Sequence, residues 1–427
     1  MQIIQKTLTD GVTLLALPDD RFKTTRLVVS LLLPLRAETA SEQAILPALL
    51  RRSCAAYPDF TALNKQLNRL YGAWISADVM RIGEVQALSL QASCLNDCFA
   101  LNGEPVVAAC AELMRGMLFE PALENGCFRD ADVEQERRCL IEDLQAEINE
   151  KRRYARRRCE EMLCEGEAYA VNCCGTVESV QALTKETITA AWKRVLSTAQ
   201  VQLIVQGGDY EAVAAAFTRG FSAIARQPVA LSTVLRVPTG IIRSETEEMP
   251  VNQSKLVMGF RCAVDDPEAA APAMRLMTAL FGGTPYSLLF RHVREELHLC
   301  YYCAATYDRH KGVLLVDSGV ERAKAPLAQD EVLRQLRRVA EGDFSDEDLE
   351  SARRSICSQF ASVDDSPSSR VTWYLGQSTA KHVQTPEQAA NAVAAVTREQ
   401  VMAAARGVSL ELVYLLASNG QGGEDDA

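Results

Sequence analysis

Residues 282–321 read GGTPYSLLFRHVREELHLCYYCAATYDRHKGVLLVDSGVE and hold the clearest local pattern in the chain. The first part predicts a helix that ends near His298, because apolar residues recur at every fourth position: Leu289, Val293 and Leu297. Two strand-like runs follow, Cys300–Thr306 and Val313–Ser318, with turn-forming residues between them. The segment is therefore predicted to form a helix and then a β-hairpin.

Two side chains near the junction of this helix and hairpin are candidates for a binding site. Arg294 is predicted in the last helical turn and Tyr301 at the start of the strand, and the chain reverses between them. A guanidinium and a phenol can both donate hydrogen bonds to the carbonyl oxygens of a peptide. The structural alternative is that Arg294 caps the C-terminus of the helix and Tyr301 packs on the sheet.

The same segment resembles the second-domain signature of the insulinase/pitrilysin-like zinc peptidase family. The resemblance rests on Gly282-Gly283, Arg294-Glu295, Leu299-Cys300-Tyr301 and the glycine hairpin. It implies an α+β fold of two duplicated domains, each a mostly antiparallel or mixed sheet with helices packed on it, forming a half-shell. It also implies that Arg294 and Tyr301 bind substrate. The likeness is strongest to a non-catalytic, YfmF-type branch associated with 5-aminopentanol modification of elongation factor P.

Composition indicates a folded cytoplasmic protein. The chain has 427 residues, 48% of them hydrophobic, which is enough for two or three domains with sizeable cores. The formal net charge of −11 argues against nucleic-acid binding, and no apolar run is long enough to span a membrane. Without a secretory signal in residues 1–19, the 14 cysteines are expected to be free thiols.

The order of predicted elements suggests two halves. We expect an N-terminal domain over residues 1–225, a linker over 226–250 that lacks periodicity, a C-terminal domain over 251–420, and a disordered tail over 421–427. Other predictions concern single helices of these domains. Ser41 is expected to cap one helix, and continuous helices are expected over Cys98–Leu118 and Asp130–Gly166.

The zinc motif of the resembled family is missing from its expected place. An inverted zincin needs His-x-x-Glu-His on one helix, and the family places it in the first helix of the first domain. Here that helix reads AILPALLRR over Ala44–Arg52, and all four histidines lie in the second half of the chain. Since catalytic zinc normally has three protein ligands, we expect no metal, no other cofactor and no catalytic residue. Glu136, Glu142 and Asp143, near the expected acidic ligand, are then simply surface charge.

Three further patterns are weak candidates for chemistry. His292 and His298 are six residues apart, so they fall on different faces of a helix. Cys300 and Cys303 form a CxxC motif within a predicted strand, where alternation places the two thiols on opposite faces. A cysteine group in the first half matches no common zinc spacing: Cys159, Cys164, Cys173 and Cys174.

These observations leave three functional hypotheses. The first is a pseudo-peptidase subunit that binds peptide, pairs with a zinc-bearing homologue or with itself, and contributes Arg294 and Tyr301 to substrate binding. The second is a scaffold or binding protein linked to elongation factor P modification, without a peptidase partner. The third is a metallopeptidase with unusual ligands, which stoichiometric zinc in the purified protein would support.

Overall fold

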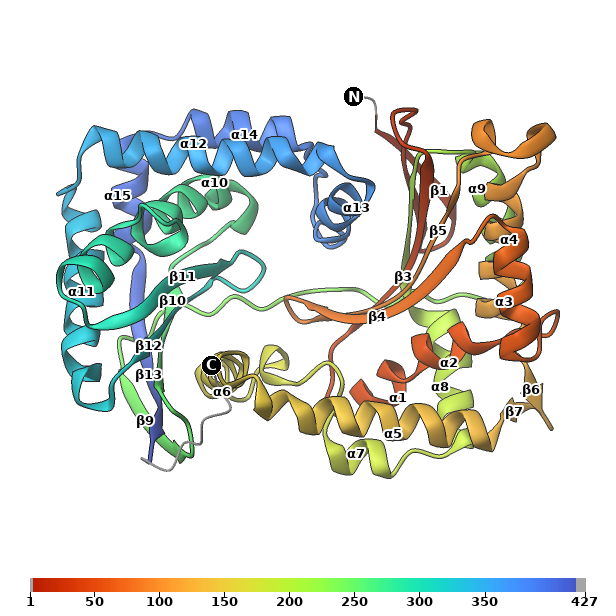
Figure 1. The fold of residues 1–427 in the computed structure, drawn as a ribbon, viewed down its shortest axis with the longest axis horizontal. Helices are drawn as coiled ribbons and strands as arrows, with labels where there is room; N and C mark the ends of the chain where they lie inside the picture. Colours follow the sequence, from red (N-terminus) through yellow and green to blue (C-terminus); the bar gives the residue numbers. More distant parts are fainter. Residues whose placement is uncertain (1–2, 420–427) are drawn as a thin grey trace. The chain divides into compact units, whose positions relative to one another are not determined.

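The computed structural model describes residues 3–419, so the predicted tail over 421–427 lies outside the described residues. The chain divides into two compact units (Figure 1). Unit 1 comprises Met1–Gln145, Val171–Ser232 and Asp364–Val383, and unit 2 comprises Ala146–Ala170, Thr233–Val363 and Gln384–Ala427. Each unit therefore contains segments that are far apart in the sequence.

Unit 1 is built on a six-stranded mixed sheet. Its strands lie in the order β1 (Ile4–Thr9), β2 (Val12–Leu17), β8 (Gln200–Gln206), β3 (Thr24–Pro34), β5 (Val85–Leu95) and β4 (Trp74–Ile82). Only β2 and β8 pair in parallel, and the other neighbours are antiparallel. Strand β4 therefore forms one edge of this sheet.

Helices cover both faces of the unit 1 sheet. One face packs in a large apolar core against α1 (Ala40–Ala44), α2 (Leu46–Arg52), α4 (Val106–Phe119), α8 (Lys185–Thr198) and α9 (Tyr210–Ser222). The other face holds α13 (Pro367–Leu375), whose Val371 and Leu375 pack on Leu15 and Ile204. Figure 1 shows α13 on the opposite side of the strands from α4 and α9. The remaining elements of the unit are α3 (Phe60–Arg69), β6 (Leu123–Glu124), β7 (Cys127–Phe128), α5 (Asp130–Ala146) and α7 (Val177–Gln181).

Unit 2 is built on a five-stranded sheet. Its order is β11 (Cys300–Asp308), β12 (Val313–Val320), β10 (Ser254–Cys262), β13 (Val408–Ser418) and β9 (Arg243–Met249), with only β9 and β13 parallel. Helix α6 (Lys151–Leu163) packs its buried side on β10, β12 and β13. The other helices are α10 (Pro267–Thr278), α11 (Ala325–Glu341), α12 (Asp346–Ser362), α14 (Pro386–Ala394) and α15 (Arg398–Arg406), of which α10 and α15 contact the sheet directly.

The predicted α+β class with two mixed sheets and packed helices is confirmed. A helical segment followed by a hairpin also occurs in both units, as α3 with β4 and β5, and as residues 290–296 with β11 and β12. In each case a residue with positive φ joins the helical segment to the edge strand: Tyr71 (φ 58°) and His298 (φ 49°). Among residues 3–419, no helix is long and apolar enough to cross a bilayer.

Several helix boundaries differ from the sequence prediction. Thr39, and not Ser41, precedes α1, and the helix breaks at Ile45 before α2, which has a proline in its first turn. The helix expected from Cys98 begins only at Val106, directly after Pro105. The long helix expected over 130–166 is interrupted between α5 and α6 at residues 147–150, and α6 lies in unit 2.

The segment expected to lack regular structure contains strand β9. Its sequence RSETEEM alternates little in hydrophobicity, and most of its residues are exposed because β9 is an edge strand of the unit 2 sheet. An edge strand with charged side chains shows no period-2 signal, although its backbone pairs fully with β13. Periodicity alone therefore missed this strand.

Candidate functional site

The helix pair α1–α2 occupies the place where the resemblance predicts a zinc motif. Ile45, Leu49 and Leu50 are at most 3% exposed and pack into the unit 1 core. Hydrocarbon side chains have no lone pairs to offer a metal ion, so these residues cannot act as zinc ligands. Within the part of the chain that the structure describes, no group of three or more His, Cys, Asp or Glu side chains is placed to hold a metal ion.

An ion-pair network connects α2 to α5 next to this position. Arg52 lies 3.0 Å from Asp132 and 2.5 Å from Glu136, and Arg129 also pairs with Asp132 at 2.7 Å. Burial opposes the charge of Arg52, but the neighbouring carboxylates outweigh it and raise the pKa of the guanidinium. The expectation that Glu136 is surface charge is wrong, because Glu136 is 9% exposed and neutralises Arg52.

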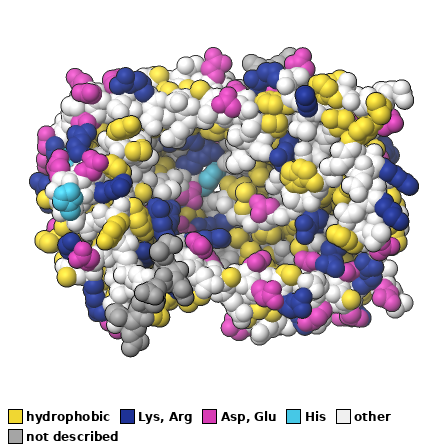
Figure 2. Space-filling view, viewed as in Figure 1, with side chains coloured by type: hydrophobic (Ala, Val, Ile, Leu, Met, Phe, Trp, Pro, Cys, Tyr) yellow, Lys and Arg dark blue, Asp and Glu magenta, His cyan; other side chains and the backbone are white. Residues whose placement is uncertain are grey.

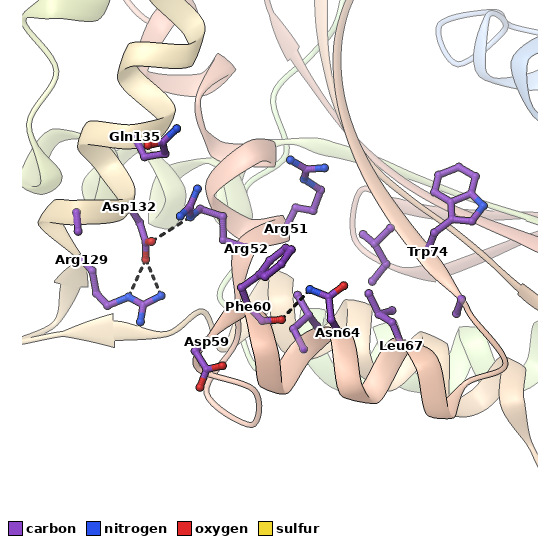
Figure 3. Close-up of a pocket in the computed structure, with 14 residues that line it drawn as sticks. Arg51, Arg52, Asp59, Phe60, Asn64, Leu67, Trp74, Arg129, Asp132 and Gln135 are labelled. Atoms are coloured by element: carbon purple, nitrogen blue, oxygen red, sulfur yellow. Dashed lines mark hydrogen bonds and ion pairs between the residues drawn. The ribbon is translucent and has the colours of Figure 1, made fainter.

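A pocket opens beside this network, entirely within unit 1 (Figure 3). It has a volume of about 800 Å³ and is formed by α2, α3, the start of β4 and the start of α5. Its apolar lining residues are Phe60, Leu63, Leu67, Ala73, Trp74, Ile75 and Ala131. A cavity of this size that combines apolar side chains with charged groups is suited to a ligand.

Exposed aromatic residues and one unpaired cation distinguish this pocket. Phe60 is 76% exposed and Trp74 is 41% exposed, and the Arg26 guanidinium lies 4.6 Å from the centre of the Trp74 ring. Arg51 also points into the pocket (Figure 3), and it makes no hydrogen bond or ion pair with any described residue. Asp59, by contrast, is engaged because it caps α3 by accepting a hydrogen bond of 2.8 Å from the Ala62 amide.

Strand β4 borders the pocket and has a free edge. It pairs with β5 on one side, and no other strand of residues 3–419 pairs with its outer side. The amide and carbonyl groups along that side can pair with an added extended chain. The pocket and the open edge thus lie next to each other, since Trp74 and Ile75 belong to both.

The predicted residues Arg294 and Tyr301 lie in unit 2. Arg294 is in a π-helical turn over Phe290–Glu296, and its guanidinium lies 4.6 Å from the centre of the Phe290 ring. Tyr301 is 71% exposed and occupies a β-bulge in β11. Both side chains are exposed, and neither makes a hydrogen bond or ion pair with a residue in the range 3–419. Their polar atoms therefore remain available for a ligand.

The thiols of Cys300 and Cys303 do not lie on opposite faces, contrary to the sequence prediction. A register shift between Cys300 and Tyr302 inserts Tyr301 as an extra residue in β11. The extra residue cancels the expected alternation: Cys300 lies opposite Val320 and Cys303 opposite Ser318, so the two side chains share one face of β11. The neighbouring His292 is engaged elsewhere, with Nδ1 2.6 Å from Glu296 and Nε2 2.9 Å from Arg338.

Sequence reasoning missed the pocket residues Arg51, Phe60 and Trp74. A usable signal was present, because large aromatic residues stand at the start of two successive elements, Phe60 at the start of α3 and Trp74 at the start of β4. Large aromatic residues exposed at two such neighbouring positions are unusual and favour a binding surface. The distance in sequence between Arg51 and the α5 residues hid the fact that they share one cavity.

Comparisons with known proteins agree with this fold. Residues 182–356 match the family model described as "Peptidase M16 inactive domain". The chain is 28% identical over 408 residues to the "Probable inactive metalloprotease YmfF" of Bacillus subtilis (strain 168), with 95% of this chain and 96% of that protein covered.

Solved structures show the same architecture over the whole chain. A conserved protein from Enterococcus faecalis V583 superposes with a TM-score of 0.89 at 22% identity, covering 99% of this chain and 100% of that chain. A protease from Helicobacter pylori superposes with a TM-score of 0.78 at 13% identity, covering 97% and 99%. The chain is therefore similar over nearly its whole length to an inactive metalloprotease-like protein, and part of its second half matches the peptidase M16 inactive domain.

Proposed function

We propose that this chain is a catalytically inactive, peptide-binding subunit that acts together with a zinc-bearing homologue. One observation carries the proposal: the helix pair α1–α2 has apolar side chains at the expected metal site, while an open pocket and a free strand edge remain beside it. The chemistry of hydrolysis is thus missing from unit 1, but the means of binding an extended peptide are present. The Bacillus subtilis relative is named a probable inactive metalloprotease, which supports the proposed loss of hydrolytic activity.

In this proposal, the peptide adds as a strand to the outer edge of β4, which requires little selectivity for its sequence. A peptide in extended conformation forms main-chain hydrogen bonds with the outer edge of β4, and these bonds do not depend on its side chains. Its alternate side chains then point to the same side as the pocket, where Phe60, Leu67 and Trp74 supply apolar contact. Binding energy is expected to concentrate on the aromatic residues.

The charges in the pocket add a preference for acidic peptides. Arg52 and Arg129 are neutralised by Asp132 and Glu136, and Asp59 caps α3, which leaves Arg51 as the pocket charge without an ion-pair partner among residues 3–419. A guanidinium binds a carboxylate through two parallel hydrogen bonds. A glutamate or aspartate side chain of the bound peptide, or its C-terminal carboxylate, fits this position.

Trp74→Ala is expected to weaken peptide binding about 10–150-fold, because loss of a large aromatic contact costs about 1.5–3 kcal/mol. Fluorescence anisotropy with a library of labelled ten-residue peptides measures this change. Phe99→Ala, which removes an exposed aromatic side chain outside the pocket, is the matched control and should leave binding unchanged. Equal losses in both variants would contradict binding at this pocket.

Arg51→Glu is expected to reverse the charge preference of the pocket, so that peptides with a lysine bind more tightly than matched peptides with a glutamate. The reason is that Arg51 is the pocket cation without an ion-pair partner among the described residues. Arg69→Glu makes the same charge change on an exposed residue of α3 that does not line the pocket. If both variants shift the preference equally, the effect is general electrostatics and not a contact with Arg51.

The proposed partner supplies the zinc ligands, and this chain supplies Arg294 and Tyr301. Their exposed polar groups suit the carbonyl oxygens of a peptide, and the Phe290 ring holds the Arg294 guanidinium in place. Affinity purification of the chain from its native cell tests the pairing. Co-purification of an M16-like protein that contains His-x-x-Glu-His supports the proposal, whereas recovery of elongation factor P or its modifying enzymes instead favours the scaffold function.

A further inference from the structure

Strand β11 contains a pair of thiols whose arrangement departs from regular β structure. Cys300 pairs with Val320, Tyr302 with Gly319 and Cys303 with Ser318, so Tyr301 is the extra residue of a bulge. In a regular strand, side chains three positions apart point to opposite faces. The bulge turns Cys300 to the side of Cys303, because Val320 and Ser318, their partners on β12, are two positions apart and face the same way.

We propose that Cys300 and Cys303 form a thiol–disulfide exchange site that reacts with a low-molecular-weight disulfide. Three features carry the proposal: the CxxC spacing, the bulge that places both thiols on one face of β11, and their unequal exposure. Cys300 is partly exposed, whereas Cys303 is 5% exposed. This inequality assigns the first attack to Cys300 and the second to Cys303.

The charges around the pair favour the same assignment. The interaction with the Cys303 thiol, aided by the positive charge of Arg294, lowers the pKa of the Cys300 thiol to about 7 against the opposing effect of burial. The interaction with Cys300 and burial raise the pKa of Cys303, and the Asp317 carboxylate on β12 adds to this effect. Asp317 is itself paired with Arg152 at 2.5 Å and Arg156 at 2.6 Å.

The reaction balances in two exchange steps. The Cys300 thiolate attacks one sulfur of the small disulfide, whose S–S bond breaks and releases one thiolate, leaving a mixed disulfide on Cys300. The Cys303 thiol then loses its proton to solvent and attacks the Cys300 sulfur, which expels the second thiolate. The protein has lost two electrons and two protons, and the small disulfide has become two thiols.

The product closes a covalent ring around Tyr301. A disulfide between Cys300 and Cys303 fixes the bulge, because the backbone of the extra residue lies between the two bonded side chains. If Tyr301 binds peptide, as the proposed function holds, oxidation restricts the conformational freedom of a residue that binds the peptide. The exchange site itself does not depend on that function.

Mass spectrometry of the full-length chain tests the site. The protein is incubated with glutathione disulfide at pH 7, free thiols are alkylated, and peptides are quantified. In the wild type we expect the peptide that contains Cys300 and Cys303 to lose two hydrogens. In the Cys303→Ser variant we expect a stable glutathione adduct on Cys300. Cys300→Ser should form neither product. The buried pair Cys94 and Cys110 should stay reduced, because both thiols are at most 2% exposed.

The pH dependence of alkylation gives a second readout. We expect the rate of Cys300 alkylation to have its midpoint near pH 7, below the pKa of about 8.5 of a cysteine in an unstructured reference peptide. Arg294→Ala should raise the Cys300 midpoint. Equal midpoints for Cys300 and the reference peptide, or full alkylation of both Cys300 and Cys303 after incubation with glutathione disulfide, would overturn the proposal.

Discussion

Replacing Glu167 with glutamine is expected to lower the free energy of unfolding of unit 2 by about 3–5 kcal/mol at pH 7. The Glu167 side chain is 2% exposed and accepts hydrogen bonds from Arg261 and from Lys311, the latter at 2.6 Å. Both cations have buried side chains. Glutamine keeps the size of the side chain but removes the carboxylate that pairs with both Arg261 and Lys311, so two buried cations lose a counter-charge.

The effect should depend on pH in a defined direction. Burial tends to raise the pKa of Glu167, but the hydrogen bonds and charges of Arg261 and Lys311 outweigh it and lower the pKa. A carboxyl group with a lowered folded-state pKa stabilises the protein above its unfolded pKa of about 4.3, and this contribution is lost as pH falls through the folded value. The difference between the wild type and Glu167→Gln should therefore shrink as the pH is lowered from 7 to 3.

Urea unfolding followed by circular dichroism measures both effects. Glu165→Gln is the matched control, because Glu165 is two residues away, has a 78% exposed side chain, and pairs with Arg243 at 3.2 Å on the surface. That variant is expected to change stability by less than about 0.5 kcal/mol. Equal stability of Glu167→Gln and Glu165→Gln would show that the buried cluster contributes no more than a surface ion pair.

Local patterns predicted the elements around residues 282–321 well. The helical segment ends at Glu296, and the strands β11 and β12 lie where the two apolar runs predicted them. These elements are set by interactions between residues close in sequence, such as a four-residue apolar repeat and a turn with Gly312 at φ 65°. The exposure of Arg294 and Tyr301 fits the predicted binding role, which remains a prediction.

Features that depend on distant parts of the chain were not predictable from local patterns. Arg370 is fully buried because it pairs with Asp19, 351 positions away in sequence, where α13 packs on the unit 1 sheet. The burial of Glu136 likewise depends on Arg52 from another helix. The bulge at Tyr301 is set by the register with β12, and a one-residue slip of register reverses which face each following side chain occupies.

If the proposed zinc-bearing partner is present, removal of the Arg294 guanidinium is expected to lower the peptidase activity of the mixture by about 10–100-fold, since a hydrogen bond from a charged group contributes about 1.5–3 kcal/mol. Tyr301→Phe removes one neutral donor and should cost about 3–10-fold, corresponding to about 0.5–1.5 kcal/mol. The wild-type chain without the partner should show no peptidase activity. Initial rates with a quenched fluorescent peptide, at fixed partner and increasing amounts of this chain, measure these changes.

Two controls separate peptide binding from loss of assembly. Arg337→Ala and Tyr286→Phe alter exposed side chains of unit 2 in the same way and should leave the rate unchanged. Size-exclusion chromatography of each mixture then shows whether the pair still forms. If Arg294→Ala forms the pair normally and cleaves at the wild-type rate, Arg294 does not bind substrate. A second outcome would also contradict the proposal. If the purified chain by itself hydrolyses peptide and a chelator stops the reaction, the chain has a metal-dependent site outside α1 and α2, and it is not an inactive subunit.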